Sequence, residues 1–121
     1  MPSKIRPTNP ILRKTIRFLY KAYKTYGAPI WKAVSEKLNV RRRARIKVNV
    51  IKLNKLTKPN DMVVVPGKVL GFGFIGHPIM VAAFSFSKSA KEKIEKVGGK
   101  CLTYEELIKI NPKGTNVKII I

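Results

Sequence analysis

The sequence predicts an α/β fold: an irregular mixed sheet with short helices, preceded by a basic N-terminal arm and a helical segment. Apolar residues recur at helical spacing near the N-terminus, β-branched runs mark the second half, and helix-capping patterns stand between those runs. Because strands are interspersed with helices rather than separated from them, a layered α/β architecture is expected. With 121 residues, of which 45% are hydrophobic, the chain is large enough for a single domain with its own core.

Residues 1–10 are predicted to form an extended arm that ends at a helix cap. Three prolines lie among polar residues in this segment. Thr8 or Asn9 is suited to cap the helix that follows, with Pro10 at the first helical position, where its missing N–H group costs nothing.

A first helix is predicted from Pro10 up to Gly27, which stops it. Large side chains recur at spacings of four, three, four and three, which is the stripe of an amphipathic helix. They are Leu12, Ile16, Leu19, Tyr23 and Tyr26. A line of cations occupies another face, so one side of the helix is expected to pack while the other meets phosphate. These cations are Arg13, Arg17, Lys21 and Lys24.

A second, shorter helix is predicted from near Pro29 to near Asn39. Its apolar residues, at spacings of three and four, are Trp31, Val34 and Leu38. Residues 47–50 then alternate enough in polarity to form a strand. Residues 51–56 either extend this strand or turn helical, and the pattern alone does not decide between the two.

Further strands are predicted in the second half of the chain. Residues 61–65 are rich in β-branched side chains and end at Pro66-Gly67, a pair typical of a turn. Strands are also expected at residues 69–70 and 79–86. Residues 117–121 are expected to form an edge or terminal strand.

Two capped helices are predicted between these strands. Ser87 is placed to cap a helix that runs through Val97 and ends at Gly98-Gly99. Thr103, with a glutamate three residues later, forms a capping-box pattern for a last helix that ends at about residue 110.

The positive charge of the chain is unevenly distributed. The net charge is +20; residues 1–60 contain 17 Lys and Arg against the single acid Glu36, a balance of +16, whereas residues 61–121 have a balance of +4. Every arginine lies within the first 45 residues. The arginines are Arg6, Arg13, Arg17, Arg41, Arg42, Arg43 and Arg45. The two halves of the chain are therefore expected to have different tasks.

A partner that carries phosphate would explain this charge. The planar guanidinium group of arginine offers a fixed fork of donors that matches phosphate and stays charged. Charge of this size also opposes compaction, so a neutralising partner is expected, and nucleic acid is the strongest candidate because phosphate neutralisation releases counterions. We therefore expect one domain over residues 1–121, with residues 1–60 as the arm, helices and linker that bind nucleic acid and residues 61–121 as a compact α/β body.

Two other partners for this charge are less well supported by the sequence. A free architectural protein that coats double-stranded DNA would need the same charge, although wedge-like minor-groove motifs are not evident. A basic helix lying on an anionic membrane would need a larger apolar face than residues 12–26 offer. The longest apolar stretches are far shorter than the roughly 20 residues that span a bilayer, so a soluble protein is expected.

Aromatic residues lie beside cations in the predicted helices, and rings in such settings can stack on unpaired bases. Tyr23, Tyr26 and Trp31 follow the helical stripes, so core packing is expected for them. Tyr20 lies outside these stripes, so core packing is less strongly predicted for it.

Residues 71–76 match the glycine pattern G-x-G-x-x-G of dinucleotide-binding turns. In that motif the third glycine opens a helix whose N-terminus holds pyrophosphate, yet Gly76 is followed by His77-Pro78 and a β-type run. We therefore expect a glycine-rich turn between strands, where an RNA backbone could approach closely.

The sequence offers few residues for catalysis or metal binding. His77 and Cys101 are the only residues of their types, so a zinc site would lack the usual ligand spacing, and no set of Ser, His and acid can be nominated. The lone cysteine fits a reducing compartment and is expected to be a small buried thiol. We predict no enzymatic activity, no metal, no cofactor and no small-molecule substrate.

A set of short motifs, taken in order from about residue 4 onwards, resembles one protein family. The motifs are Thr8-Asn9-Pro10, Ile30-Trp31-Lys32, Arg42-Arg43, Val48-Asn49-Val50, the run of residues 63–73, Ala82-Ala83, Phe86-Ser87 and Gly98-Gly99. They resemble the archaeal and eukaryotic large-subunit ribosomal protein eighteen family, which is related to bacterial large-subunit protein fifteen. The short chain, without an additional basic C-terminal extension, is similar to the archaeal members.

This resemblance implies a structural protein of the cytoplasmic ribosome that binds large-subunit ribosomal RNA and contacts neighbouring ribosomal proteins, with no catalysis. The family's basic motif falls on Arg42 and Arg43, its Val-Asn motif on Asn49, and its glycine-rich segment on Lys68, Gly71 and Gly73. With the cations inferred from charge and adjacency, the expected RNA-binding residues are Asn9, Arg13, Arg17, Lys24, Lys32, Arg41, Arg42, Arg43, Arg45, Lys47, Asn49, Lys68, Gly71 and Gly73. The arginines are expected to neutralise phosphates where RNA helices converge, while Asn49 and main-chain groups contact hydroxyls.

Overall fold

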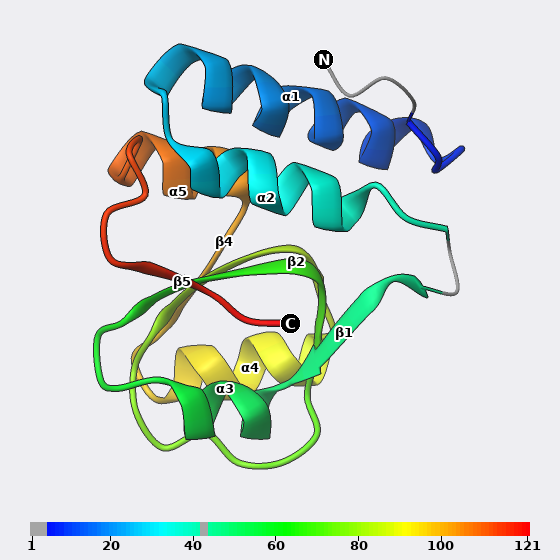
Figure 1. Ribbon diagram of the computed structural model, residues 1–121. Helices are drawn as coiled ribbons and strands as arrows, with labels where there is room; N and C mark the ends of the chain where they lie inside the picture. The colour runs from blue at the N-terminus through cyan, green and yellow to red at the C-terminus, as the bar shows by residue number, and fades with distance from the viewer. Residues whose placement is uncertain (1–4, 42–43) are drawn as a thin grey trace.

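The computed structural model describes residues 5–41 and 44–121, and it confirms the α/β class expected from the sequence. These ranges form five helices and five strands (Figure 1). The helices are α1 (Pro10–Tyr26), α2 (Pro29–Leu38), α3 (Val50–Leu56), α4 (Lys88–Lys96) and α5 (Tyr104–Ile110). The strands are β1 (Ile46–Asn49), β2 (Met62–Leu70), β3 (Met80–Phe86), β4 (Lys100–Leu102) and β5 (Val117–Ile119).

The strands form one sheet with β2 at its centre. Strand β2 pairs with β3 along one edge and with two short strands along the other, β5 against its first residues and β1 against its last. Strand β4 extends the sheet beyond β3. Each of these pairings is parallel, so the mixed sheet expected from the sequence is, within the described residues, a parallel one.

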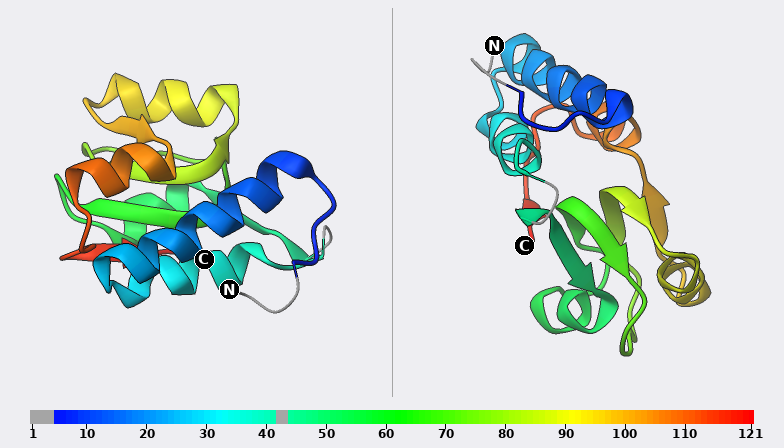
Figure 2. Two further views of the ribbon diagram at one scale, coloured as in Figure 1. Left: turned by 90° about the horizontal axis from the view of Figure 1, so that it is seen from above. Right: turned by 90° about the vertical axis from the view of Figure 1, so that its right-hand side faces the viewer.

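Helices cover both faces of the sheet (Figures 1 and 2). Helices α2 and α5, with α1 lying over them, cover one face, and α3 and α4 cover the other. Alternate strand residues supply the two cores: Val64 and Ala82 belong to the core with α1, α2 and α5, whereas Val63 and Val81 belong to the core with α3 and α4. Burial on both faces explains the almost continuous apolar runs of the central strands. No helix in the described ranges is long and apolar enough to cross a membrane.

The first helix begins and ends where the sequence predicts. The side-chain oxygen of Asn9 accepts hydrogen bonds from the N–H groups of Ile11 (2.9 Å) and Leu12 (3.3 Å), so Asn9 is the cap. Gly27 ends the helix with a φ of 65°, in the left-handed region. The prediction that Tyr26 packs in the core was wrong, because this last helical residue lies where the chain turns away and is 43% exposed.

Buried groups of α2 connect it to α1 and to the last third of the chain. Trp31 is completely buried, as predicted, and its indole N–H donates to the carbonyl of Pro112 at 2.7 Å. The Ser35 hydroxyl donates to the Ile16 carbonyl of α1 at 3.1 Å. The helical layer is thus fixed by polar contacts inside an apolar core, where hydrogen bonds are protected from water.

The predicted turn at Pro66-Gly67 was wrong, because this pair lies inside β2. The register against β3 shifts between Val65 and Lys68, which marks a bulge. A bulge tolerates the missing N–H group of Pro66. A side chain at Gly67 would place its Cβ 2.1 Å from the Ile46 carbonyl oxygen, so glycine is needed for β1 to approach.

The structure decides between strand and helix for residues 51–56, and it contains one strand, β4, that was not predicted. Residues 51–56 belong to helix α3, while residues 46–49 form β1. The predicted cap at Ser87 is confirmed by its hydrogen bond from the Ala90 N–H group. The capping box at Thr103 is confirmed as well. Strand β4 was not predicted, because three residues after a glycine pair form no recognisable pattern.

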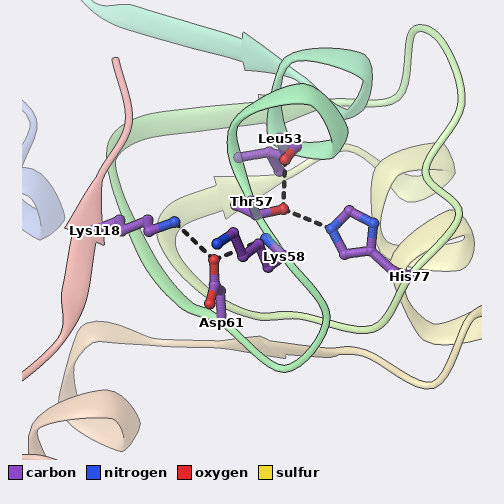
Figure 3. A network of polar contacts seen from close by, with 6 residues as sticks. All are labelled: Leu53, Thr57, Lys58, Asp61, His77 and Lys118. Atoms are coloured by element: carbon purple, nitrogen blue, oxygen red, sulfur yellow. Dashed lines mark hydrogen bonds and ion pairs between the residues drawn. The ribbon is translucent and has the colours of Figure 1, made fainter.

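Residues 71–79 connect β2 to β3 without a helix of their own. No helix begins at Gly76, so the expected glycine-rich segment between strands is confirmed. Near the end of this segment, His77 contacts Thr57, the residue that caps the end of α3 (Figure 3). The Thr57 hydroxyl donates to the Leu53 carbonyl at 2.6 Å, which leaves its oxygen to accept from Nε2 of His77 at 2.7 Å.

Asp61 joins the start of β2 to β5 in the same region (Figure 3). Its Oδ2 accepts hydrogen bonds from the N–H group of Lys58 at 2.8 Å and from Nζ of Lys118 at 2.9 Å. The hydrogen bond from the Lys58 main chain, followed by that from Lys118, holds the pKa of Asp61 below its ordinary value of 3.8. The ionised carboxylate is therefore the form that the fold favours.

Replacing Trp31 with Ala is expected to lower the free energy of unfolding by about 3–5 kcal/mol, because it opens a large cavity in the helical layer. The Trp31→Phe variant keeps most of the ring and should lose clearly less. Chemical denaturation followed by circular dichroism measures both variants. Equal losses in the two would mean that the filled volume is not what stabilises this site.

The Asp61→Asn variant should be less stable than the parent at neutral pH and equally stable in strong acid. Because the pKa of Asp61 is lowered on folding, its contribution is present above the unfolded value of 3.8 and is lost as the pH falls through the folded value. Thermal unfolding of both proteins over a pH series measures this, and a gap that persists in strong acid would contradict the assignment.

Candidate nucleic-acid interface

Most cations in the described part of the chain have no acidic partner within the fold. Among the side chains of the described residues, Lys118 and Asp61 form the one ion pair, with an N···O distance of 2.9 Å. The sequence has 26 Lys and Arg against six acids. The resulting self-repulsion is uncompensated in the isolated protein and would be relieved by a polyanion.

An open hollow of about 760 Å³ lies where the N-terminal arm meets the end of α2. Three arginines line it, Arg6 from the arm and Arg41 and Arg45 from the segment after α2, and residues 7–11 form the rest of the described wall. None of these lining residues is acidic. The main-chain N–H group of Arg6 donates to Oδ1 of Asn39 at 2.7 Å, which fastens the arm to the end of α2. We call this feature the arginine hollow.

Arg45 is the most constrained of the three arginines. Its side chain also lines a narrow apolar crevice between the end of α2 and the bulge of β2, beside Leu38 and Pro66. Its Nε atom is buried and has no hydrogen-bond partner among the described residues. A buried N–H group without an acceptor costs free energy, so the hydrogen bonding of Arg45 is incomplete within the described fold.

Arg13 holds the arm in place. Its Nη1 donates to the carbonyl oxygens of Ile5 (3.2 Å) and Pro7 (2.9 Å), which flank Arg6 in the chain. A guanidinium group has five N–H donors, so Arg13 keeps others for a ligand. Its first effect is nevertheless to position Arg6 at the arginine hollow.

Two lysines lie side by side on the sheet next to this hollow. Lys47 of β1 and Lys68 of β2 are partners in the parallel register, and both are exposed. The residues that follow them, Val48 and Val69, belong to the core with α3 and α4, so the lysines point to the side of α1 and α2. Like charges opposite one another destabilise a sheet unless something neutralises them.

The arginine hollow and the lysine pair lie next to each other. Arg45 of the hollow precedes Lys47 by two residues, and its crevice includes Pro66 and Gly67, which directly precede Lys68. We call the combined feature the basic surface. Its described members are Arg6, Arg41, Arg45, Lys47 and Lys68.

A third group of predicted residues gathers around the tyrosines of α1. Nζ of Lys24 lies 5.6 Å from the centre of the Tyr20 ring, and Nζ of Lys32 lies 5.5 Å from that of Tyr23. The two rings meet edge to face at 5.8 Å. Lys24 and Lys32 are thus held over aromatic rings at the outer side of α1 and α2, where their exposed ammonium groups remain accessible.

The other predicted residues are dispersed. Arg17 is exposed on α1, and Asn49 ends β1 with a side chain that makes no capping bond to α3. Gly71 and Gly73 lie in the connection after β2, where the protein itself requires glycine: a Cβ at these positions would lie 1.9 Å from Oγ of Ser89 and 2.4 Å from Cβ of Ile51. Arg42 and Arg43 lie outside the described residues.

Sequence reasoning missed Arg6 as a member of the site. The arm was predicted to be extended, and nothing in its pattern indicated that it would fold back onto the end of α2. The available signal was the residue type itself, since every other arginine belongs to the predicted set of RNA-binding residues.

Cys101 is only partly buried, against the core with α3 and α4, rather than fully buried as the sequence predicts. Burial, with a smaller effect from the nearby carboxylate of Glu95, raises the pKa of its thiol to about 11. The nucleophilic thiolate is therefore scarce at neutral pH.

A small α/β fold that gathers uncompensated cations on one surface defines a basic protein suited to a polyanionic partner. The chain belongs to the ribosomal protein 60S L18 and 50S L18e family, whose model matches residues 2–121. The resemblance found in the sequence motifs is thereby confirmed. Because this is a family of structural ribosomal proteins, the expectation that the chain is not an enzyme is confirmed too.

Relatives named large ribosomal subunit protein eL18 align with almost the whole chain. The Archaeoglobus fulgidus protein is 48% identical over 97% of this chain and 100% of its own length. The Methanopyrus kandleri protein is 50% identical over 94% of both chains. The Sulfurisphaera tokodaii protein is 48% identical over 99% of this chain and 98% of its own length.

The Lys68→Gln variant is expected to be more stable than the parent protein at low salt, by about 0.2–1 kcal/mol, because it removes the repulsion with Lys47. The gain should shrink at high salt, which screens exposed charges. Lys100→Gln, at an exposed position of β4, is the matched control. Thermal unfolding at low and high salt measures both, and an equal gain in the control would show a net-charge effect rather than a pair effect.

Proposed function

We propose that this chain is a structural constituent of the large ribosomal subunit and that it binds large-subunit ribosomal RNA through the basic surface. On this proposal it lies in cytoplasmic ribosomes, beside neighbouring ribosomal proteins. Family membership supports the location. The observation that carries RNA binding is the arginine hollow, which is lined by three arginines and by no acidic residue among its described lining.

The chemistry of the basic surface suits a phosphate backbone. Guanidinium groups bind phosphate in pairs of parallel hydrogen bonds, so Arg6, Arg41 and Arg45 would hold a strand in a defined position. Lys47 and Lys68 would add charge without fixed geometry. Contacts of this kind set register and orientation and carry no sequence information, so the protein recognises RNA architecture.

The remaining predicted residues extend this interface. Arg42 and Arg43 follow Arg41 in the chain and would add phosphate contacts beside the hollow. Asn49, at the far end of β1, would contact hydroxyl groups, which distinguish RNA from DNA. In this proposal residues 1–60 supply most of the RNA contacts, while residues 61–121 supply most of the α/β body of a single domain.

Sedimentation of a native lysate tests the location directly. The lysate is run on a sucrose gradient before and after a high-salt wash, and the chain is detected by immunoblotting. Stoichiometric, salt-resistant migration with the large subunit is expected of a structural constituent. Migration at the top of the gradient or with DNA would overturn the proposal.

Removing the three arginine charges of the hollow should weaken binding to large-subunit ribosomal RNA and flatten its salt dependence. The variant Arg6→Gln, Arg41→Gln, Arg45→Met keeps the Arg45 stem in its crevice. Each phosphate contact contributes about 0.9 or less to the slope of log K against log salt, so the slope should fall by about two to three. Filter binding over a salt series gives the slope.

The matched control is the variant Lys96→Gln, Lys100→Gln, Lys113→Gln, which removes the same charge from exposed positions away from the basic surface. Its slope should change much less. An identical slope in both variants would show that net charge, and not the hollow, governs binding. Equal affinity of the parent protein for any DNA duplex would favour the architectural DNA-binding alternative.

A further inference from the structure

We propose that Phe72 and Phe74 form a second contact with ribosomal RNA, in which their rings stack on unpaired bases. Their side chains are 74% and 67% exposed, whereas the other three phenylalanines are half-buried. The loop of residues 71–79 carries them between α3 and α4, at the end of the molecule opposite α1 (Figures 1 and 2). Such exposure of two large apolar rings in one short loop indicates a binding function.

The loop is fastened to α4 on one side. Nζ of Lys93 donates to the carbonyl oxygens of Gly71 at 2.6 Å and Gly73 at 2.8 Å, the residues on either side of Phe72. Gly71 also lies against the start of this helix, since a Cβ there would be 1.9 Å from Oγ of Ser89. The main chain that carries Phe72 is therefore held at both neighbours.

The loop is fastened to α3 on the other side. The carbonyl oxygen of Phe72 accepts a hydrogen bond from the Ile51 N–H group at 3.2 Å, and the Gly76 N–H group donates to Oδ1 of Asn54 at 3.0 Å. Gly73 adopts a φ of 92° and packs on Ile51. Because the loop is already ordered, little conformational entropy remains to be lost when its rings bind a partner.

The Phe74 ring is supported from within the loop. A Cβ at Gly76 would lie 2.7 Å from Cε2 of Phe74, so the ring rests against the main chain at that glycine. With 67% of the side chain still exposed, the ring presents a supported aromatic surface to solvent. A flat surface of this kind is what base stacking requires, because every base has a π-face.

The charges around the loop favour nucleic acid as its partner. The ammonium group of Lys93 has three donors, of which the loop carbonyls use two, so one remains for a phosphate oxygen. Lys55 is exposed one helical turn after Ile51, on the same side of α3 as the loop contact. Residues 71–79 contain no acid. Aromatic rings between cations are the combination that binds unpaired nucleotides.

This inference rests on the proposed function and adds a different kind of contact. The basic surface would bind phosphates at the α1 and α2 side, whereas the loop would bind bases at the opposite end of the molecule (Figure 2). One protein would thereby connect two separate elements of the RNA. Stacking contributes little to counterion release, so the two contacts differ in their dependence on salt.

Four pairs of substitutions at Phe72 and Phe74 test the stacking. Alanine at either position is expected to weaken binding to large-subunit ribosomal RNA roughly 5- to 150-fold per ring, with an unchanged salt slope. Tyrosine or tryptophan at either position should retain affinity, because the flat ring is kept. Leucine should behave like alanine, because it is apolar but cannot stack. Both residues are exposed, so thermal unfolding should show folding intact in all variants.

The leucine variants separate RNA bases from a protein pocket. If leucine retains affinity or assembly while alanine does not, the contact is an apolar one, and stacking is overturned. Ultraviolet cross-linking of the intact large subunit, followed by mass spectrometry, should join Phe72 or Phe74 to a nucleotide. A loop found cross-linked to a protein instead would also overturn the inference.

The two proposals fail in distinguishable ways. If the parent protein does not bind large-subunit ribosomal RNA, the proposed function fails and the stacking fails with it. If the parent protein binds and the Arg6, Arg41 and Arg45 variant loses salt-dependent affinity, but the alanine variants at Phe72 and Phe74 bind as tightly as the parent, the stacking alone fails.

Discussion

The close approach of the Ile46 carbonyl to Gly67 is the contact on which the arrangement of this protein depends. Strand β2 pairs with β1, β3 and β5, and its bulge at Pro66-Gly67 is where β1 can enter the sheet. Entry at that point places Arg45 in the crevice beside the bulge and Lys47 next to Lys68. A backbone requirement of the sheet therefore fixes the position of the cations, and the basic surface follows from packing rather than from the charge pattern alone.

The apolar cores that stabilise the fold and the cations of the basic surface lie in different parts of the molecule. Two apolar cores, one on each face of the sheet, hold the fold together with few ionic contacts in the described residues. The cations are left where they repel one another, in the arginine hollow and at the lysine pair. Repulsion among these cations opposes the compact state of the free protein, and a polyanion that bound the folded state would offset this repulsion by shifting the folding equilibrium.

The helices were the most predictable part of the fold, because caps such as Asn9 and Thr103 and the apolar stripe of α1 are local signals. The errors arose where tertiary contacts decide: Pro66-Gly67 is a bulge because β1 approaches it, and β4 exists because β3 offers an edge. The charge of the site was evident from the sequence, but its geometry was not. No local pattern indicated that the arm would fold back to α2 or that the loop at residues 71–76 would expose its phenylalanines.

The position of β5 has a consequence for how the chain reaches its native state. This strand pairs with the first residues of β2, yet it is synthesised long after them, once α4 and α5 have been made. The parallel sheet is therefore built from contacts between residues distant in the sequence, which makes folding slow relative to local helix formation. Until β5 docks, the first residues of β2 keep an unpaired edge, and an unpaired edge is a site where strands of other chains can pair.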